Sequence, residues 1–308
     1  MEAETKDGQE VQRHFTEITQ THPDISAGVA AIQTLLWFLE THKMETIAEI
    51  RARLAEAIKA MTQSDLSVPS IQSGCEQFVR FITLTNIQRA DFEEIQKILI
   101  YRGTKFLQKH SNARERIAGK AHHFVTDGAT ILLHGYSRVV MRVLKEATAA
   151  QKHFRVYVTQ SLPDGAGQRA YAELTALDIP TTVILDASVG YIMEKVDMVL
   201  VGAESVVENG GIINKIGTFS IAIQARAMNK PFYAVAETFK FARVYPLNQQ
   251  DLPNEYKYRA STLRSGTDLQ LEHPLVDYTP PSYITLLFSD IGILTPSAVS
   301  DELIKLYC

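Results

Sequence analysis

From residue 129 onward, short and unbroken apolar runs alternate with stretches of helical spacing. The runs are ATILLH (129–134), FRVYVT (154–159), TTVILD (181–186), DMVLVG (197–202) and PFYAVA (231–236). Strands that are buried on both faces read as continuous apolar runs, and their alternation with helices is typical of a parallel sheet covered by helices. The pattern therefore predicts an α/β fold with a Rossmann-like, doubly wound parallel sheet. SYITLLFSDIGIL (282–294) restores strand character, and the residues after Pro296 predict a final helix.

The first 127 residues have a different periodicity. Ile32, Leu35 and Leu39 recur at helical spacing, after a capping residue at Asp24 or Ser26. We therefore predict two domains, a helical N-terminal domain over 1–127 and an α/β domain over 128–308. Residues 237–282 are rich in proline and charge, which predicts an excursion over the surface.

Composition excludes several classes of protein. The net charge of the 308 residues is -4, so no basic excess indicates nucleic-acid binding. The apolar runs are too short to span a membrane, and the polar, acidic N-terminus is neither a secretory signal nor a transit peptide. Cys75 and Cys308 lie far apart and form neither a metal motif nor a disulfide framework. We expect a cytosolic (cytoplasmic) protein without a bound metal, a nucleic-acid partner or a membrane partner.

In an open parallel sheet, ligands bind beyond the carboxyl ends of the strands, which right-handed crossovers bring to one rim. Five loops with polar groups fall there and predict a pocket. They are residues 135–138, 160–167, 186–190, 202–218 and 237–240.

The loop at 202–218 is the most informative of the five. Asn209-Gly210-Gly211 can adopt positive φ and bring backbone N–H groups to a ligand, and a helix is expected from residue 216. Lys215 stands near that helix start, where an anion would remove an unfavourable interaction with the helix dipole. A solvent-facing lysine beside an ordinary turn is an equally good interpretation. Neither nucleotide-binding glycine motif is present.

Other rim residues have two interpretations each. Glu204 is either a general base or hydroxyl acceptor, or a carboxylate paired with a neighbour. His134 fits a hydrogen-bonded core residue better than a catalyst, and Asp186 fits a cap of the turn that follows it. Ser137 fits a helix N-cap, and Arg138 beside it could reach a phosphate.

The 201–218 loop, ILLHGYSRVV, DASVGYIMEKVDMVLVGAE and the tail ITLLFSDIGILTPSAVSDELIKL resemble one family. It is the family of the alpha, beta and delta regulatory subunits of eukaryotic translation initiation factor 2B. It also contains aldose–ketose isomerases of sugar phosphates, such as methylthioribose-1-phosphate isomerase and ribose-1,5-bisphosphate isomerase. The resemblance covers nearly the whole chain, from SAGVAAIQTLLWFLE onward.

The resemblance implies a binding pocket without catalysis. The family's enzymes use a cysteine after the first-strand histidine and an aspartate in a Gly-Ala-Asp motif, where this chain has Gly135 and Glu204. The arginine of the enzymes' Glu-Thr-Arg-Pro loop is Leu162 here, whereas Asn214 and Lys215 match the enzymes' Asn-Lys pair. We expect no catalytic residues, no cofactor and no isomerase turnover, but a pocket for a stabilising sugar phosphate or nucleotide monophosphate. The residues expected to bind this ligand are Tyr136, Ser137, Arg138, Gln160, Glu204, Asn214 and Lys215. The alternatives are an active sugar-phosphate aldose–ketose isomerase and a vestigial, empty pocket.

The resemblance also implies a function in protein biosynthesis. It suggests a regulatory, non-catalytic subunit of the guanine-nucleotide exchange complex for initiation factor two, active in the integrated stress response. Such a subunit would homodimerise through the α/β domain and join beta, delta, gamma and epsilon subunits in a two-fold symmetric decamer. It would sense initiation factor two phosphorylated on its alpha subunit through the helical domain, at Glu40, Thr41 and Lys43. A solvated helix end is the other interpretation of these three residues.

Overall fold

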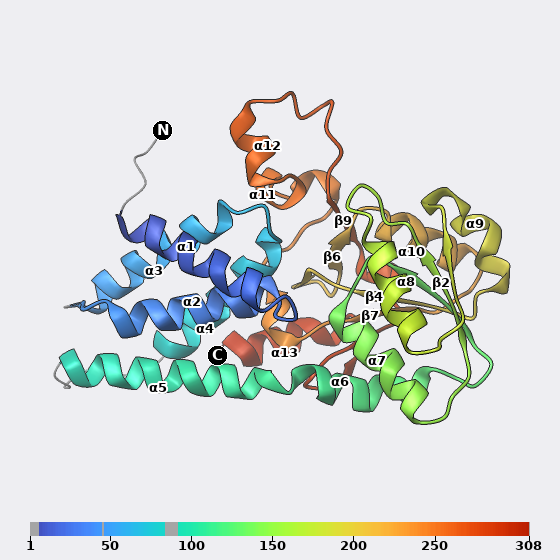
Figure 1. Ribbon diagram of the computed structural model, residues 1–308, viewed down its shortest axis with the longest axis horizontal. Coiled ribbons are helices and arrows are strands. Elements are labelled where there is room, and N and C mark those ends of the chain that lie inside the picture. Colours follow the sequence, from blue (N-terminus) through green and yellow to red (C-terminus); the bar gives the residue numbers. More distant parts are fainter. Residues whose placement is uncertain (1–5, 45, 84–91, 308) are drawn as a thin grey trace. The chain divides into compact units, whose positions relative to one another are not determined.

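The computed structural model describes residues 6–44, 46–83 and 92–307, which form two compact units (Figure 1). The first unit contains the described residues up to Ser111 together with Tyr258–Glu272, and the second contains Asn112–Lys257 and His273–Leu306. This division differs from the predicted boundary at 127/128. Helix α6 (Ala113–Ala121) belongs to the second unit, because its Ile117 and Ala121 pack in the core of the α/β sheet.

The first unit is helical, as predicted. Its helices are α1 (Lys6–Thr21), α2 (Ala27–Thr41), α3 (Ile47–Thr62), α4 (Val68–Thr83), α5 (Phe92–Ser111) and the short α12 (Ala260–Ser265). Ser26 is the cap of α2, where its hydroxyl accepts the Val29 N–H, and Thr46 caps α3 in the same way. Helix α2 is largely apolar and lies at the centre of this core, with Leu35 and Phe38 almost fully buried.

The second unit is built on the predicted parallel sheet. Its strand order is β11-β10-β7-β4-β1-β2-β3, and all neighbours are parallel except β10 and β11. The strands are β1 (Thr130–His134), β2 (Arg155–Thr159), β3 (Thr181–Ile184), β4 (Met198–Gly202), β7 (Phe232–Val235), β10 (Leu286–Phe288) and β11 (Ile293–Leu294). Every residue of the central β4 is buried, which is why the apolar runs identified these strands.

Helices complete the second unit. They are α6, α7 (Arg138–Ala149), α8 (Ala166–Ala176), α9 (Val189–Ile192), α10 (Thr218–Ala227), α11 (Asn254–Lys257) and α13 (Ala298–Tyr307). No helix of the described residues is long and apolar enough to cross a membrane. Cys75 is fully buried in the first unit, and burial raises the pKa of its thiol; Cys308 lies outside the described residues.

A second sheet was not predicted. Its order is β8-β5-β6-β9, and its strands are β5 (Ser205–Val207), β6 (Ile212–Lys215), β8 (Phe241–Ala242) and β9 (Val276–Thr279). Strands β5 and β6 form an antiparallel hairpin, so residues 202–218 are not the glycine-rich turn and immediate helix that we expected. Residues 237–282 likewise contain β8, α11, α12 and β9 rather than only a surface loop.

The strand order fixes where a ligand would lie. Along the main sheet, β2 and β3 follow β1 on one side, and β4 and β7 lie on the other. The order therefore reverses between β1 and β4, and in open α/β sheets the crevice beyond such a switch point binds ligands. The loops that begin at Gly135 and Ala203 leave the sheet at this crevice.

Candidate functional site

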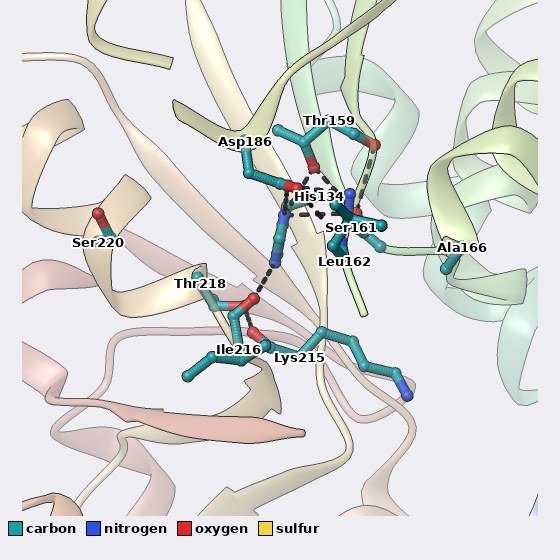
Figure 2. A network of polar contacts seen from close by, with 12 residues as sticks. His134, Thr159, Ser161, Leu162, Ala166, Asp186, Lys215, Ile216, Thr218 and Ser220 are labelled. Atoms are coloured by element: carbon teal, nitrogen blue, oxygen red, sulfur yellow. Dashed lines mark hydrogen bonds and ion pairs between the residues drawn. The ribbon is translucent and has the colours of Figure 1, made fainter. Parts of the chain in front are cut away.

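His134 is the centre of a polar network at the end of β1 (Figure 2). It is 3% exposed; its Nδ1 lies 2.7 Å from Thr159 Oγ1, and its Nε2 lies 2.8 Å from the Ile216 carbonyl oxygen. A carbonyl only accepts, so Nε2 carries the proton in the neutral ring and Nδ1 accepts from the Thr159 hydroxyl. Burial lowers the pKa of His134, against the opposing effect of the Ile216 carbonyl. His134 is therefore a neutral, hydrogen-bonded core residue.

The network continues into the loops after β1 and β2. Since Thr159 donates to His134, the Ser161 hydroxyl donates to Thr159 Oγ1 at 2.9 Å, and Ser161 Oγ accepts the Gly135 N–H at 2.7 Å. Asp186 accepts the Ser161 N–H at 2.9 Å and the Leu162 N–H at 3.2 Å. Asp186 thus fixes the neighbouring 160–163 loop, instead of capping its own turn as we expected.

Lys215, Glu204 and Gly135 lie close together. The Lys215 Nζ is 3.0 Å from Asp164 Oδ2 and 4.0 Å from Glu204 Oε1. The other Asp164 oxygen accepts the Ala166 N–H at the start of α8, at 3.1 Å. The stem of Lys215 runs beside Gly135, where an added Cβ would lie 3.4 Å from Lys215 Cγ. The site is thus a lysine between two carboxylates, each about a quarter exposed.

The glycine-rich turn does not form an anion site, so that prediction was wrong. Gly210 donates its N–H to the Val207 carbonyl, and Gly211 donates its N–H to the Asn209 side chain, both at 2.9 Å. These groups close the β5–β6 hairpin at the opposite end of β6 from Lys215.

The start of α10 is occupied by a carboxylate that sequence reasoning missed. Asp277 Oδ2, on β9, accepts the Gly217 N–H at 2.8 Å and the Phe219 N–H at 3.1 Å. Asn214 is 5% exposed and donates to the Thr218 hydroxyl at 3.0 Å, so its amide is used inside the fold. Asp277 is 63 residues from Asn214 and 60 from Gly217 along the chain, and no local motif indicates this contact.

The predicted residues before and within α7 lie beside α8. The Tyr136 hydroxyl donates to Glu173 at 2.7 Å, and the Arg169 guanidinium lies 4.0 Å from the centre of the Tyr136 ring. Burial, followed by the charges of Arg114 and Arg169, lowers the pKa of Arg138. Cations from three helices therefore gather near the beginning of α7.

Ser137 and Gln160 complete the rim. Ser137 is the N-cap residue of α7, but its hydroxyl makes no capping hydrogen bond. Its side chain instead covers Gly202, where an added Cβ would come within 2.5 Å of Ser137 Oγ. Gln160, directly after β2, makes two backbone hydrogen bonds. Its N–H donates to the Ile184 carbonyl of β3, and its carbonyl accepts the Gly167 N–H of α8.

The rim loop at 237–240 contains a buried ion cluster that sequence reasoning missed. Glu237 follows β7 and is 2% exposed; it accepts from Arg114 at 3.0 Å and lies 3.3 Å from Lys240. Burial alone would raise the pKa of Glu237, but Lys240 and Arg114 lower it to about 2. The sequence showed charges at these positions but not that they meet.

The predicted partner-binding residues lie in the first unit, at the end of α2. Glu40, Thr41 and Lys43 are all exposed. The Thr41 hydroxyl donates to the Trp37 carbonyl at 2.9 Å, in the last turn of the helix. These three residues are thus accessible within their own unit. Their exposure is compatible with both a partner-binding surface and a solvated helix end.

Comparison with known proteins gives one family and several relatives. Residues 20–296 match the initiation factor 2 subunit family. The chain is 42% identical over 315 residues to translation initiation factor eIF2B subunit alpha of Dictyostelium discoideum, covering 98% of each chain. It is 40% identical to the Caenorhabditis elegans protein of the same name, over 94% of this chain and 95% of the relative. It is also 26% identical to ribose 1,5-bisphosphate isomerase of Thermococcus kodakarensis, over 86% of this chain and 84% of the enzyme.

Solved structures show the same fold. The crystal structure of translation initiation factor eIF-2B from Pyrococcus horikoshii superposes with a TM-score of 0.71 at 24% identity, covering 95% of this chain and 98% of that one. A chain of the tetrameric eIF2B-beta2-delta2 complex from C. thermophilum gives a TM-score of 0.76 at 17% identity, covering 98% and 96%. These likenesses confirm the predicted combination of a helical N-terminal region and a C-terminal α/β sheet.

Proposed function

Because this chain belongs to the initiation factor 2 subunit family, we propose that it is the alpha regulatory subunit of the eIF2B guanine-nucleotide exchange complex. The observation that carries the proposal is the identity of 42% and 40%, over nearly the whole chain, to two eIF2B alpha subunits. Partial matches to one domain would support only a shared fold. A match along both compact units supports a shared function.

The rim site supports a subunit without catalytic activity. Gly135 has no ionisable group, and both ring nitrogens of the adjacent His134 are engaged in hydrogen bonds inside the protein. Glu204 lies within ion-pair distance of Lys215 and would act as an acceptor for a ligand hydroxyl. Because losing one positioned acid or base costs roughly 10²–10⁴-fold in rate, the absence of a thiol at residue 135 predicts no isomerase turnover.

The same site would hold a sugar phosphate or a nucleotide monophosphate. The Asp164 and Glu204 carboxylates are acceptors for ligand hydroxyl groups, and the Lys215 ammonium between them is a donor to a phosphate. Tyr136, Ser137, Arg138 and Gln160 would line the rest of the site, with Arg138 as the second cation. The two N–H groups that Asp277 holds are excluded from this role, so the phosphate would depend on side chains.

Assembly and sensing complete the proposal. The subunit would form a homodimer in the cytosol and join the beta, delta, gamma and epsilon subunits in a decamer. Leu185, directly after the edge strand β3, is 57% exposed and Tyr191 of α9 is 81% exposed, which favours a protein contact in the second unit. Glu40, Thr41 and Lys43 would contact phosphorylated initiation factor two, and a ligand that binds the dimer best would stabilise the assembly.

Reconstitution tests the subunit proposal directly. The recombinant chain is mixed with beta, delta, gamma and epsilon subunits, and particle mass and nucleotide exchange on initiation factor two are measured with and without it. We expect a larger, two-fold symmetric particle and an exchange rate that is inhibited by phosphorylated factor only when this chain is present. A chain that neither enters the particle nor changes this inhibition would refute the proposal.

The alternative is an active isomerase, favoured by the likeness to ribose 1,5-bisphosphate isomerase. A coupled assay with ribose 1,5-bisphosphate and methylthioribose 1-phosphate distinguishes the two functions. Turnover above that of a heat-inactivated sample would establish the enzyme and overturn the non-catalytic proposal.

A further inference from the structure

Asp277 is a buried carboxylate at the start of α10. It is 6% exposed; its Oδ2 accepts two backbone N–H groups, and its Oδ1 is buried without a hydrogen-bond partner among the described residues. Burial raises the pKa of Asp277 to about 7, although the Phe219 and Gly217 N–H groups lower it. A carboxylate in this environment changes its charge close to neutral pH.

The groups around Asp277 leave this charge uncompensated. Its neighbour on β6 is Asn214, and the only charged residue of α10 is Arg226, in the last turn. Lys215 lies within ion-pair distance of Asp164 and Glu204. Helix α11 packs against β9, and its charged residues are the exposed Glu255 and the half-buried Lys257. Burial therefore raises the pKa of Asp277 against the opposing effect of the two N–H groups.

The contacts of Asp277 reach the ligand site through one short loop. Gly217 has a φ of +101°, and an added Cβ there would lie 3.1 Å from His134 Cε1. Ile216, between Lys215 and Gly217, accepts the His134 N–H. The loop is therefore held on one side by Asp277 and on the other by His134, and Lys215 immediately precedes it.

We propose that Asp277 is a titratable cap of α10 that positions the Ile216–Gly217 loop, and with it Lys215. When ionised, the carboxylate binds both N–H groups as an internal anion and opposes a second anion nearby. When protonated, it holds the N–H groups less strongly and no longer repels a phosphate. The predicted effect of Asp277 on phosphate binding rests on the proposed function. Its role as a cap of the Gly217 and Phe219 N–H groups does not.

Amide resonances of the wild-type protein test the cap without any ligand. We expect the N–H signals of Gly217 and Phe219 to titrate together between pH 6 and 8. In Asp277→Asn these shifts should disappear, because an amide mimics the protonated acid at every pH. Signals of Gly217 and Phe219 that stay constant over this range in the wild-type protein would overturn the proposal.

The melting temperature gives a second readout. The folded protein binds the Asp277 proton up to about pH 7, whereas the unfolded chain releases it near 3.8, so stability falls as the pH rises through this window. Asp277→Asn should therefore melt several degrees above wild type at pH 8, and this difference should narrow steadily as the pH falls toward 3.8. A pH-independent difference in melting temperature would mean that Asp277 has only a structural role.

A binding test can distinguish failure of this proposal from failure of the proposed ligand site, if the ligand has no group that titrates in the same pH range. Calorimetry with a hexose 6-sulfate should show tighter binding to wild type at pH 6 than at pH 8, by about threefold or more, and no such ratio in Asp277→Asn. Equal affinity at both pH values would overturn the link between the cap and Lys215. If neither a hexose 6-sulfate nor a hexose 6-phosphate binds at any pH, the ligand site fails, and the amide titration still decides the cap.

Discussion

Gly135 occupies a backbone conformation that few other residues adopt. Its φ is +75°, and its N–H is donated to Ser161. We predict that Gly135→Ala destabilises the protein by about 1–2 kcal/mol, because an L-residue is strained in the left-handed region. The added Cβ would make only an ordinary contact with Lys215, so strain rather than overlap is the cause. Urea unfolding measures the loss.

Gly119→Ala is the matched control for this substitution. Gly119 lies within helix α6, and an added Cβ there meets nothing within 4 Å. The change should stabilise the protein by about 0.5–1 kcal/mol, since alanine is the better helix former. Losses of equal size at both positions would contradict the argument from φ.

Lys215 supplies the cation of the proposed ligand site. We predict that Lys215→Ala weakens binding of a hexose 6-phosphate by about tenfold or more, since one charge-assisted hydrogen bond contributes about 1.5–3 kcal/mol. Titration calorimetry measures the Kd, and the melting temperature without ligand should change little. Lys305→Ala, which removes an exposed lysine of α13 paired with Glu302, serves as the control and should leave the Kd unchanged. An unaltered Kd in Lys215→Ala would remove Lys215 from the site.

Helix α6 is held to the sheet by buried charge as well as by apolar packing. We predict that Arg114→Ala costs about 3 kcal/mol, because it removes the 3.0 Å ion pair of the buried Glu237. Arg142→Ala is the control: Arg142 is partly exposed and lies 3.9 Å from the exposed Glu115, so loss of this ion pair should cost about 0.5 kcal/mol or less. Denaturant unfolding at pH 7 would measure the loss of stability in both variants.

The pH dependence of these variants checks the cause. Because the folded-state pKa of Glu237 lies below 4.5, its contribution to stability is present above pH 4.5 and is lost as the pH falls toward 2. The difference between wild type and Arg114→Ala should therefore shrink in acid. A difference that is constant from pH 7 to pH 3 would show that Arg114 acts through packing alone.

Elements that are buried on both faces could be predicted from the sequence, and elements with distant partners could not. The strands of the main sheet were found because each is a short apolar run followed by a helix. The second sheet was missed because its strands have two to four residues, and β6 pairs with β9 across a long insertion. The start of α10 was placed too early for the same reason, since Lys215 belongs to β6.

The site was only partly predictable, and for a related reason. The rule that ligands bind at the carboxyl ends of parallel strands brought Gly135, Glu204 and Lys215 together correctly. Asp164 and Asp277 are ordinary loop and strand carboxylates in the sequence, and only the folded chain shows which cation or N–H group each one meets. Partners of buried charges depend on long-range packing, which no local pattern encodes.

At the scale of the whole molecule, the chain passes between its two units more than once. Residues Tyr258–Glu272 belong to the first unit, although the residues on both sides of this segment belong to the second. Asp65, between α3 and α4, accepts the Ser261 N–H at 2.8 Å and the Ser261 hydroxyl at 2.7 Å. Arg264 also donates to the Gln63 carbonyl at 3.1 Å, so a few polar contacts dock the segment on its unit.

Because both partners are exposed, Asp65 is a contact that can be removed without opening a core. We predict that Asp65→Ala releases residues 258–272 while both units stay folded, so trypsin should cut after Arg259 and Arg264 several times faster than in wild type. The Ser261 N–H lowers the pKa of Asp65 below 3.8, so the contact is present above that pH, and the segment should be released in wild type as the pH falls through the lowered pKa. Asp301→Ala, an exposed carboxylate of α13, is the control. Unchanged cleavage in Asp65→Ala would assign the docking to contacts other than this carboxylate, since the one helix of the segment, α12, is too short to be stable alone.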